Sequence, residues 1–224
     1  MINASPEQYQ VFFYSLSIWL LPGLLAITVH EAAHGLAALY YGDKTAFFLG
    51  RTSLNPLKHI DPVGTVIVPF LLLFMQAFFL FGWAKPVPIN QRNLKNPRKD
   101  MAVIALAGPV SNFIMFIAWL AIAKIAALAY PHYPSPYLEW LLQTSNIGIF
   151  FNLILAIFNL LPIPPLDGSK ILQAILPHKL AEIFYTLEPY GLLIILALIF
   201  SGFLPLLISP PIMFLYKQAL SFLQ

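Results

Sequence analysis

The feature that most constrains this chain is a series of apolar runs, each long enough or nearly long enough to form a membrane-spanning helix. A helix needs about 20 residues to cross about 30 Å of hydrocarbon. The five runs occupy residues 9–29, 62–82, 101–129, 137–161 and 180–208. Only 9% of the 224 residues are charged, against roughly 25% in soluble domains. We therefore expect an integral membrane protein that crosses the bilayer several times.

Lysine and arginine gather in short loops, whereas the N-terminus and the 130–136 loop hold none. The basic loops are residues 43–60, 83–99 and 162–179. Basic loops stay on the cytoplasmic side, so the 62–82 run must begin and end on that side. We expect it to be a re-entrant segment, because Gly64, Pro69 and Gly82 allow bending.

The net charge of +3 does not indicate a nucleic-acid partner, because no basic stripe with interleaved aromatic residues is present. The sequence contains no cysteine, so disulfides and thiolate metal sites are excluded. Any transition metal must be bound by histidine and carboxylate side chains.

The segment TAFFLGRTSLNP, residues 45–56, predicts one or two short β-strands at the membrane edge, which could pair with an unwound substrate. The last apolar region should form two helices broken around Pro205 and around residues 209–211. The predicted fold is an all-α polytopic membrane protein with a re-entrant or short β element and two C-terminal helices. Residues 1–224 should form a single membrane domain.

The sequence His30-Glu31-Ala32-Ala33-His34 carries the strongest chemical signal. Positions i and i+4 share one face of a helix, so both imidazoles can bind a single metal ion. Glu31 lies one step round the helix and can serve as the general base that activates water. Ionisable residues in an apolar helix are costly and tend to mark function.

Asp167 is the best candidate for a third ligand among the acidic residues. It follows an apolar helix and lies in a stiff loop with Pro162, Pro164 and Pro165, where Gly168 permits a tight turn. An ordinary N-cap of the next helix, near residues 168–176, describes the same residue equally well.

Three motifs in order, together with one loop, resemble the site-2 protease family of intramembrane metallopeptidases. The first is His30-Glu31-x-x-His34, and the last is Asn159-x-x-Pro162-x-Pro164-x-Leu166-Asp167-Gly168. Between them lie Gly82-Trp83-Ala84-Lys85-Pro86-Val87-Pro88, similar to a loop of compact members, and Ala107-Gly108-Pro109-x-x-Asn112, similar to the middle core helix. Together the motifs cover about residues 20–180.

The resemblance implies one zinc ion held by His30, His34 and Asp167, with Glu31 as base, in a core of three transmembrane helices. It also implies substrates that are transmembrane segments of other proteins, cut near the cytoplasmic side of the bilayer. We expect the protein in the cell membrane of a prokaryote. The sequence contains no PDZ-like or CBS-like module such as many relatives carry.

Two amides on apolar helices, Asn112 and Asn159, could bind the substrate backbone or steady the oxyanion. For Asn112, a purely interhelical role is at least as good an interpretation. Two other hypotheses stay open: a zinc peptidase whose third ligand is Glu182 or Glu188, and a metal transporter or scaffold without catalysis. Neither late glutamate lies in a recognisable motif, and no repeated half typical of transporters is visible.

Overall fold

The structure is built from long apolar helices with shorter helices between them along the chain. The computed structural model describes residues 5–75 and 82–223. The principal helices are α1 (Pro6–Tyr40), α4 (Pro97–Ala129), α5 (Pro136–Asn159), α8 (Gly191–Phe200) and α9 (Phe203–Leu223). The shorter ones are α2 (Thr45–Phe48), α3 (Val68–Phe74), α6 (Asp167–Ile175) and α7 (His178–Leu187). Single turns of other helix types lie at Pro56–Lys58, Pro62–Ile67, Gln91–Asn93 and Glu188–Tyr190.

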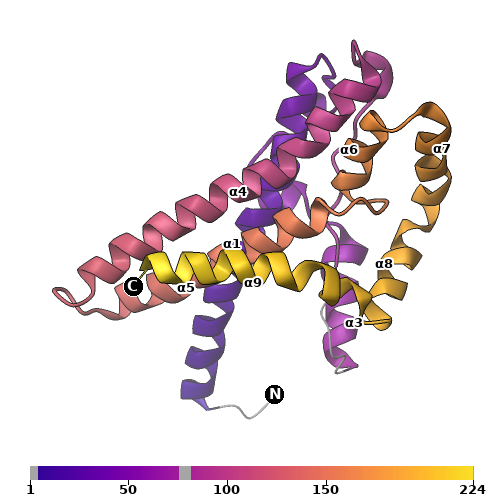
Figure 1. The fold of residues 1–224 in the computed structure, drawn as a ribbon. Helices are drawn as coiled ribbons and strands as arrows, with labels where there is room; N and C mark the ends of the chain where they lie inside the picture. Colours follow the sequence, from indigo (N-terminus) through magenta and orange to yellow (C-terminus); the bar gives the residue numbers. More distant parts are fainter. Residues whose placement is uncertain (1–4, 76–81, 224) are drawn as a thin grey trace.

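Helix α4 is the centre of the bundle, in contact with α1, α5, α6 and α9. Figure 1 shows α4 and α5 crossing α1, α9 lying along α5, and α6 beside the first turns of α4. The α4–α5 contact is close because Gly148 has no side chain. A Cβ at that position would lie 2.5 Å from the Trp119 ring. Trp119, Ala123, Ile149, Leu153 and Ala219 form the buried core between α4, α5 and α9.

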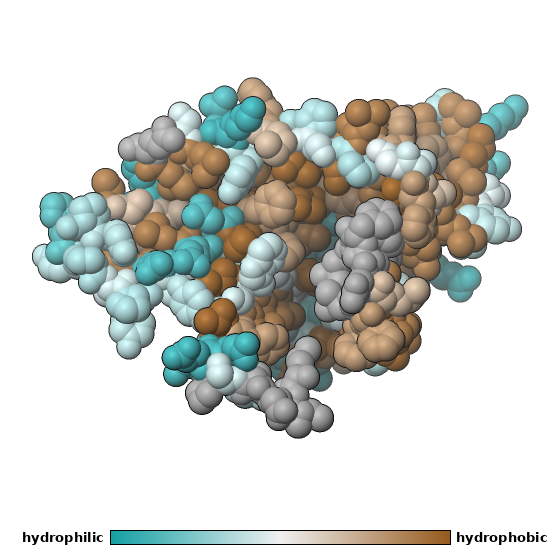
Figure 2. All heavy atoms as spheres, turned by 90° about the horizontal axis from the view of Figure 1, so that it is seen from below, coloured by the Kyte–Doolittle hydropathy of each residue, from teal (hydrophilic) through white to brown (hydrophobic). Residues whose placement is uncertain are grey.

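The surface of the bundle is apolar, as a lipid environment requires. Large apolar side chains such as Phe13, Ile114, Ile117 and Leu193 are exposed along the long helices. Apolar side chains cover most of the middle and right of the face in Figure 2, and hydrophilic ones gather mainly towards the left. The structure thus supports an integral membrane protein.

The prediction of three transmembrane helices with a β element is wrong. Five stretches of the described chain are long and apolar enough to cross a membrane, namely Glu7–Tyr40, Pro97–Ala129, Pro136–Asn159, His178–Phe200 and Phe203–Leu223. Residues 5–75 and 82–223 contain no strand. The segment expected to be β begins with the short helix α2 and continues as turns and irregular chain. Asp43 accepts hydrogen bonds from the backbone N–H and the hydroxyl of Thr45, which starts a helical turn, and Gly50 with φ of 66° follows its end.

The break near the C-terminus lies at Gly202 rather than at the prolines. Gly202 adopts φ of 72° between α8 and α9, a conformation that glycine reaches without strain. Helix α9 runs through Pro210 and Pro211, because a membrane helix can satisfy the freed carbonyls through its neighbours. Pro205 lies in its first turn, where no N–H is needed.

After α3, the chain returns to the segment that precedes α3. The N–H of Trp83 donates to the carbonyl of Gly64 (3.1 Å), and the Thr65 hydroxyl donates to the carbonyl of Trp83 (2.8 Å). The apolar helix Pro62–Leu72 is shorter than a membrane crossing requires. The rest of the predicted re-entrant segment, residues 76–81, lies outside the described residues.

Candidate metal centre

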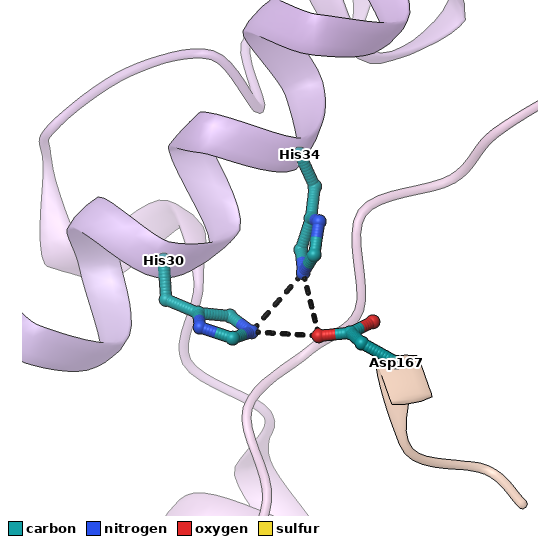
Figure 3. A group of neighbouring side chains, drawn as sticks. All are labelled: His30, His34 and Asp167. Atoms are coloured by element: carbon teal, nitrogen blue, oxygen red, sulfur yellow. Dashed lines mark hydrogen bonds and ion pairs between the residues drawn. The ribbon is translucent and has the colours of Figure 1, made fainter. Parts of the chain in front are cut away.

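Three side chains from opposite parts of the sequence converge on one point. His30 Nε2 and His34 Nε2 lie 3.0 Å apart, and Asp167 Oδ2 lies 3.2 Å from each of them. Figure 3 shows the two rings projecting from successive turns of α1 towards the carboxylate at the start of α6. All three side chains are buried. Within residues 5–75 and 82–223, no other group of three His or carboxylate side chains converges in this way.

The second nitrogen of each imidazole is held by an oxygen of helix α4. His30 Nδ1 lies 2.6 Å from Asn112 Oδ1, and His34 Nδ1 lies 2.7 Å from the carbonyl oxygen of Ile104. A carbonyl oxygen only accepts hydrogen bonds, so each Nδ1 carries the hydrogen. Each Nε2 is therefore the ring nitrogen left to bind a metal, and the two Nε2 atoms face each other and the carboxylate.

Such a cluster of acceptors is stable when a cation lies between them. Asp167 Oδ2 is buried and accepts no well-aligned hydrogen bond. Zinc with bonds of about 2.1 Å to nitrogen and oxygen in a tetrahedron places neighbouring ligand atoms roughly 3.4 Å apart. The observed separations of 3.0–3.2 Å match that spacing, so two imidazoles and one carboxylate fit zinc.

Helix α4 supports both rings with one stripe of residues spaced four apart: Ile104, Gly108 and Asn112. Gly108 is required because a Cβ there would lie 2.5 Å from His34 Nε2 and 2.6 Å from His30 Nε2. The glycine lets the imidazoles rest on the α4 backbone, while the residues one turn away on either side accept their Nδ1 hydrogens.

Asn112 is fully buried, and both ends of its amide are hydrogen-bonded to other residues of the protein. Its nitrogen donates to the carbonyl of Ala26 (3.1 Å) and to Asn152 Oδ1 (2.9 Å), while its oxygen accepts from His30. Asn152 in turn donates to the carbonyl of Gly148. The amide thus has no hydrogen left for a substrate, and it links α1, α4 and α5 at the metal centre. Asn159, the other amide expected at the site, donates to the carbonyl of Leu155 in its own helix; its substrate role stays a prediction.

The Pro-rich loop delivers Asp167 to the histidines. Leu166 is the N-cap residue of α6, and Asp167 is the first residue of the helix, so its carboxylate faces the imidazoles rather than capping. The start of α6 packs tightly on the end of α5. A Cβ at Gly168 would lie 2.2 Å from the carbonyl oxygen of Leu160.

Asp167 is held as an anion. Burial raises the pKa of its carboxyl, but the adjoining imidazoles and the charge of Lys170, whose Nζ lies 3.8 Å from Oδ1, outweigh burial and hold the pKa well below its usual value. A permanently charged carboxylate is the form that binds a metal.

Glu31 is half-buried beside the histidines. Its Oε2 accepts a hydrogen bond from the backbone N–H of Val87 (3.1 Å). The segment that carries Val87 was singled out in the sequence only by resemblance. The sequence does contain a relevant pattern, because Val87 has the one backbone N–H between Pro86 and Pro88.

Asp43 was missed in the sequence, yet it organises the loops next to the site. It is fully buried and accepts from Thr45, from the Asn93 amide (2.8 Å) and from the backbone N–H of Asn90 (2.7 Å). Burial raises the pKa of its carboxyl, but these hydrogen bonds outweigh burial and lower the pKa. A sequence signal was present, since an aspartate directly after a helix and two residues before threonine favours an Asx turn.

Comparison with known proteins settles the family. The chain is 38% identical over 176 residues to the "Putative zinc metalloprotease YwhC" of Bacillus subtilis, a match that covers 78% of this chain and 76% of the relative. The model of peptidase family M50 matches residues 126–200, which include Asp167.

The chain belongs to peptidase family M50.

Other relatives agree with this assignment to family M50, and the predicted site-2 protease resemblance is confirmed. Rip2 of Mycolicibacterium smegmatis, also named a putative zinc metalloprotease, is 26% identical over 85% of this chain and 68% of its own length. Stage IV sporulation protein FB of Bacillus subtilis is 27% identical over 70% of this chain and 50% of its own length. No solved structure matches the chain significantly. The names of the relatives indicate a zinc metalloprotease. The buried group of His30, His34 and Asp167 described above is compatible with a zinc ion.

Proposed function

We propose that this M50 protein is an intramembrane endopeptidase that holds one zinc ion per chain with His30, His34 and Asp167 and uses Glu31 as general base. The observation that carries the proposal is the convergence of two imidazole Nε2 atoms and one carboxylate oxygen within 3.2 Å. A transporter or scaffold needs no ionisable residue at the position of Glu31. A third ligand from Glu182 or Glu188 is not needed, because Asp167 already completes the set that catalytic zinc sites use.

When bound, zinc lowers the pKa of water towards about 7 and polarises the scissile carbonyl. The protein residues supply the proton transfers. Oε2 of Glu31 is engaged by Val87, so Oε1 is the oxygen available to take a proton from the attacking water. The same carboxylic acid then donates that proton to the departing amine.

The proposed substrates are transmembrane segments of other membrane proteins, with no role for nucleic acid. The support is the apolar surface of the long helices, which lets a substrate helix approach from the bilayer. A helical substrate has its amides hydrogen-bonded internally, so the scissile bond must first leave the helix.

We place the active site near the cytoplasmic face of a prokaryotic cell membrane. His34 lies in the last two turns of α1, just before a basic loop, and Asp167 lies in another basic loop. Basic loops are retained in the cytoplasm. The bacterial sources of the relatives named above support the cell membrane.

The test compares purified wild type with Glu31→Gln on a single-span substrate in lipid vesicles, with the cut mapped by mass spectrometry. The expected result is wild-type cleavage within the membrane segment, and loss of cleavage by Glu31→Gln with zinc retained. Cleavage by Glu31→Gln at the wild-type rate would show that Glu31 is not the general base, and absence of cleavage by both proteins would favour a transporter or a scaffold.

A further inference from the structure

Residues 83–90 form an extended strap that crosses from α3 to α2 beside the candidate active site. From Trp83 to Val87, every second N–H donates towards the neighbouring chain: Trp83 to the carbonyl of Gly64 (3.1 Å), Lys85 to the carbonyl of His59 (2.9 Å), and Val87 to Glu31 Oε2 (3.1 Å). A period of two is that of an extended chain. The contact with Glu31 is therefore the third in a regular series.

The sequence of the strap excludes a shift of register by one residue. Val87 lies between Pro86 and Pro88, and proline has no N–H. A shift by one residue in either direction would bring a proline to Glu31 and leave its carboxylate without the hydrogen bond. The prolines also fix the backbone φ on both sides of Val87, which limits rotation of the one N–H that remains.

The strap is anchored on both sides of Val87. At its start, the Trp83 ring lies against Gly64, where a Cβ would come within 2.3 Å of it. At its end, the N–H of Asn90 donates to Asp43. The Val87 side chain is itself buried, at 9% exposed. These contacts place the Val87 N–H before any substrate is present.

We propose that the backbone N–H of Val87 is a positioning group that holds the Glu31 carboxylate in its working orientation. With Oε2 occupied, the carboxylate cannot rotate freely, and Oε1 is left for the attacking water. This inference rests on the proposed function, in which Glu31 is the general base. It explains the Pro-Val-Pro sequence as a device that offers one fixed donor to one oxygen.

The alternative role for the same contact is inhibition: the strap would block Glu31 and would have to move away before the reaction. Removal of the hydrogen bond would then raise turnover. Under the positioning role, removal lowers kcat and leaves substrate binding unchanged, because the Val87 N–H touches the base and not the substrate.

The experiment replaces Val87 by its α-hydroxy acid analogue through nonsense suppression in the full-length protein, which exchanges the N–H for an ester oxygen and keeps the side chain. The matched control is the same replacement at Lys85, which removes a strap hydrogen bond that does not reach Glu31. Zinc content, kcat and KM are measured on a single-span substrate. We expect the Val87 ester to lose about 10- to 100-fold in kcat, as for a hydrogen bond to a charged group. Its KM and zinc content should stay within about twofold of wild type, and the Lys85 ester should lose less than about threefold in kcat.

A second pair of variants supports the ester pair: Val87→Pro removes the hydrogen, and Val87→Ala keeps it. A test of coupling uses Glu31→Asp, whose shorter carboxylate is withdrawn from the strap. In that background the Val87 ester should cause little further loss, since the two changes remove one interaction.

Each outcome has one reading. Equal losses from the Val87 and Lys85 esters would show that the strap is merely structural, and a rise in kcat would show that it blocks the base; either result overturns the inference. Wild-type kcat in the Val87 ester overturns it as well, while inactivity of Glu31→Gln leaves the proposed function intact. If Glu31→Gln is fully active, the proposed function itself fails.

Discussion

The side-chain oxygen of Asn112 on α4 lies 2.6 Å from Nδ1 of His30 on α1. This contact fixes the tautomer of a candidate metal ligand, and the Asn112 amide is itself fixed by the carbonyl of Ala26 and by Asn152. The metal centre thus depends on a chain of amides that crosses three helices.

Substitution Asn112→Ala should weaken zinc binding by about 10- to 100-fold, because His30 loses the partner that orients its ring. Competition with a fluorescent chelator measures the affinity. Gln143→Ala is the matched control, since its amide bonds to Glu139 on the same exposed helix face and should leave the affinity unchanged. An Asn112→Ala protein with wild-type affinity would contradict the positioning role.

Asp167→Ala should lose stoichiometric zinc, because two imidazoles alone do not complete the ligand set. Glu182→Ala and Glu188→Ala should keep it, since neither residue belongs to the converging group. The zinc content of each variant is measured by elemental analysis after dialysis. Zinc loss in either late glutamate variant, with retention in Asp167→Ala, would reverse the ligand assignment.

Gly108→Ala should abolish zinc binding or strongly reduce it, because the new methyl group would lie 2.5 Å from His34 Nε2. Gly23→Ala is the control: it also adds a methyl group within a long helix, but the nearest atom of Phe151 lies at an ordinary 3.5 Å. Alanine favours helix over glycine by up to about 1 kcal/mol, so the control should fold as well as wild type. The prediction fails if both variants bind zinc equally.

Asp43→Asn should lower the free energy of unfolding near pH 7 by about 1–3 kcal/mol, since a buried charged acceptor with several donors is lost. The pKa of Asp43 is lowered in the folded protein. Its stabilising contribution is therefore present above the unfolded pKa near 3.9 and is lost as pH falls through the folded value. Thermal unfolding in detergent should show that the difference in stability between wild type and variant becomes smaller below about pH 4. A stability difference that does not change with pH would show that the charge of Asp43 is not the cause of the stabilisation.

The candidate ligand set could be predicted from the sequence because it depends on local spacing and on one topological argument. His30 and His34 share a helix face by their separation of four residues, and the basic loops predict that Asp167 lies on the same side of the membrane. The structure brings the three together. The N-cap alternative for Asp167 could not be settled from sequence, because it depends on whether the helix begins at 166 or 167.

The supporting residues could not be predicted in the same way. The role of Gly108 depends on how closely α1 approaches α4, and Ile104 contributes a backbone oxygen that every residue has. The β element was predicted from the composition of residues 45–56, but a strand also needs a partner strand to hydrogen-bond with, which composition does not reveal. Asp43 instead gives the chain a helical turn at Thr45. The prolines near 205–211 were read as breaks, whereas one glycine in a left-handed conformation separates α8 from α9.

The stripe Ile104, Gly108 and Asn112 has a consequence for biogenesis. Both imidazoles contact one face of α4, and the carboxylate arrives only after α5 has docked and turned. A slip of α4 by a single turn would take the Asn112 oxygen away from His30 and push a side chain into the rings. A newly inserted or misassembled chain therefore lacks the assembled candidate metal centre, and the proposed peptidase activity would appear only once the helices have reached their final alignment.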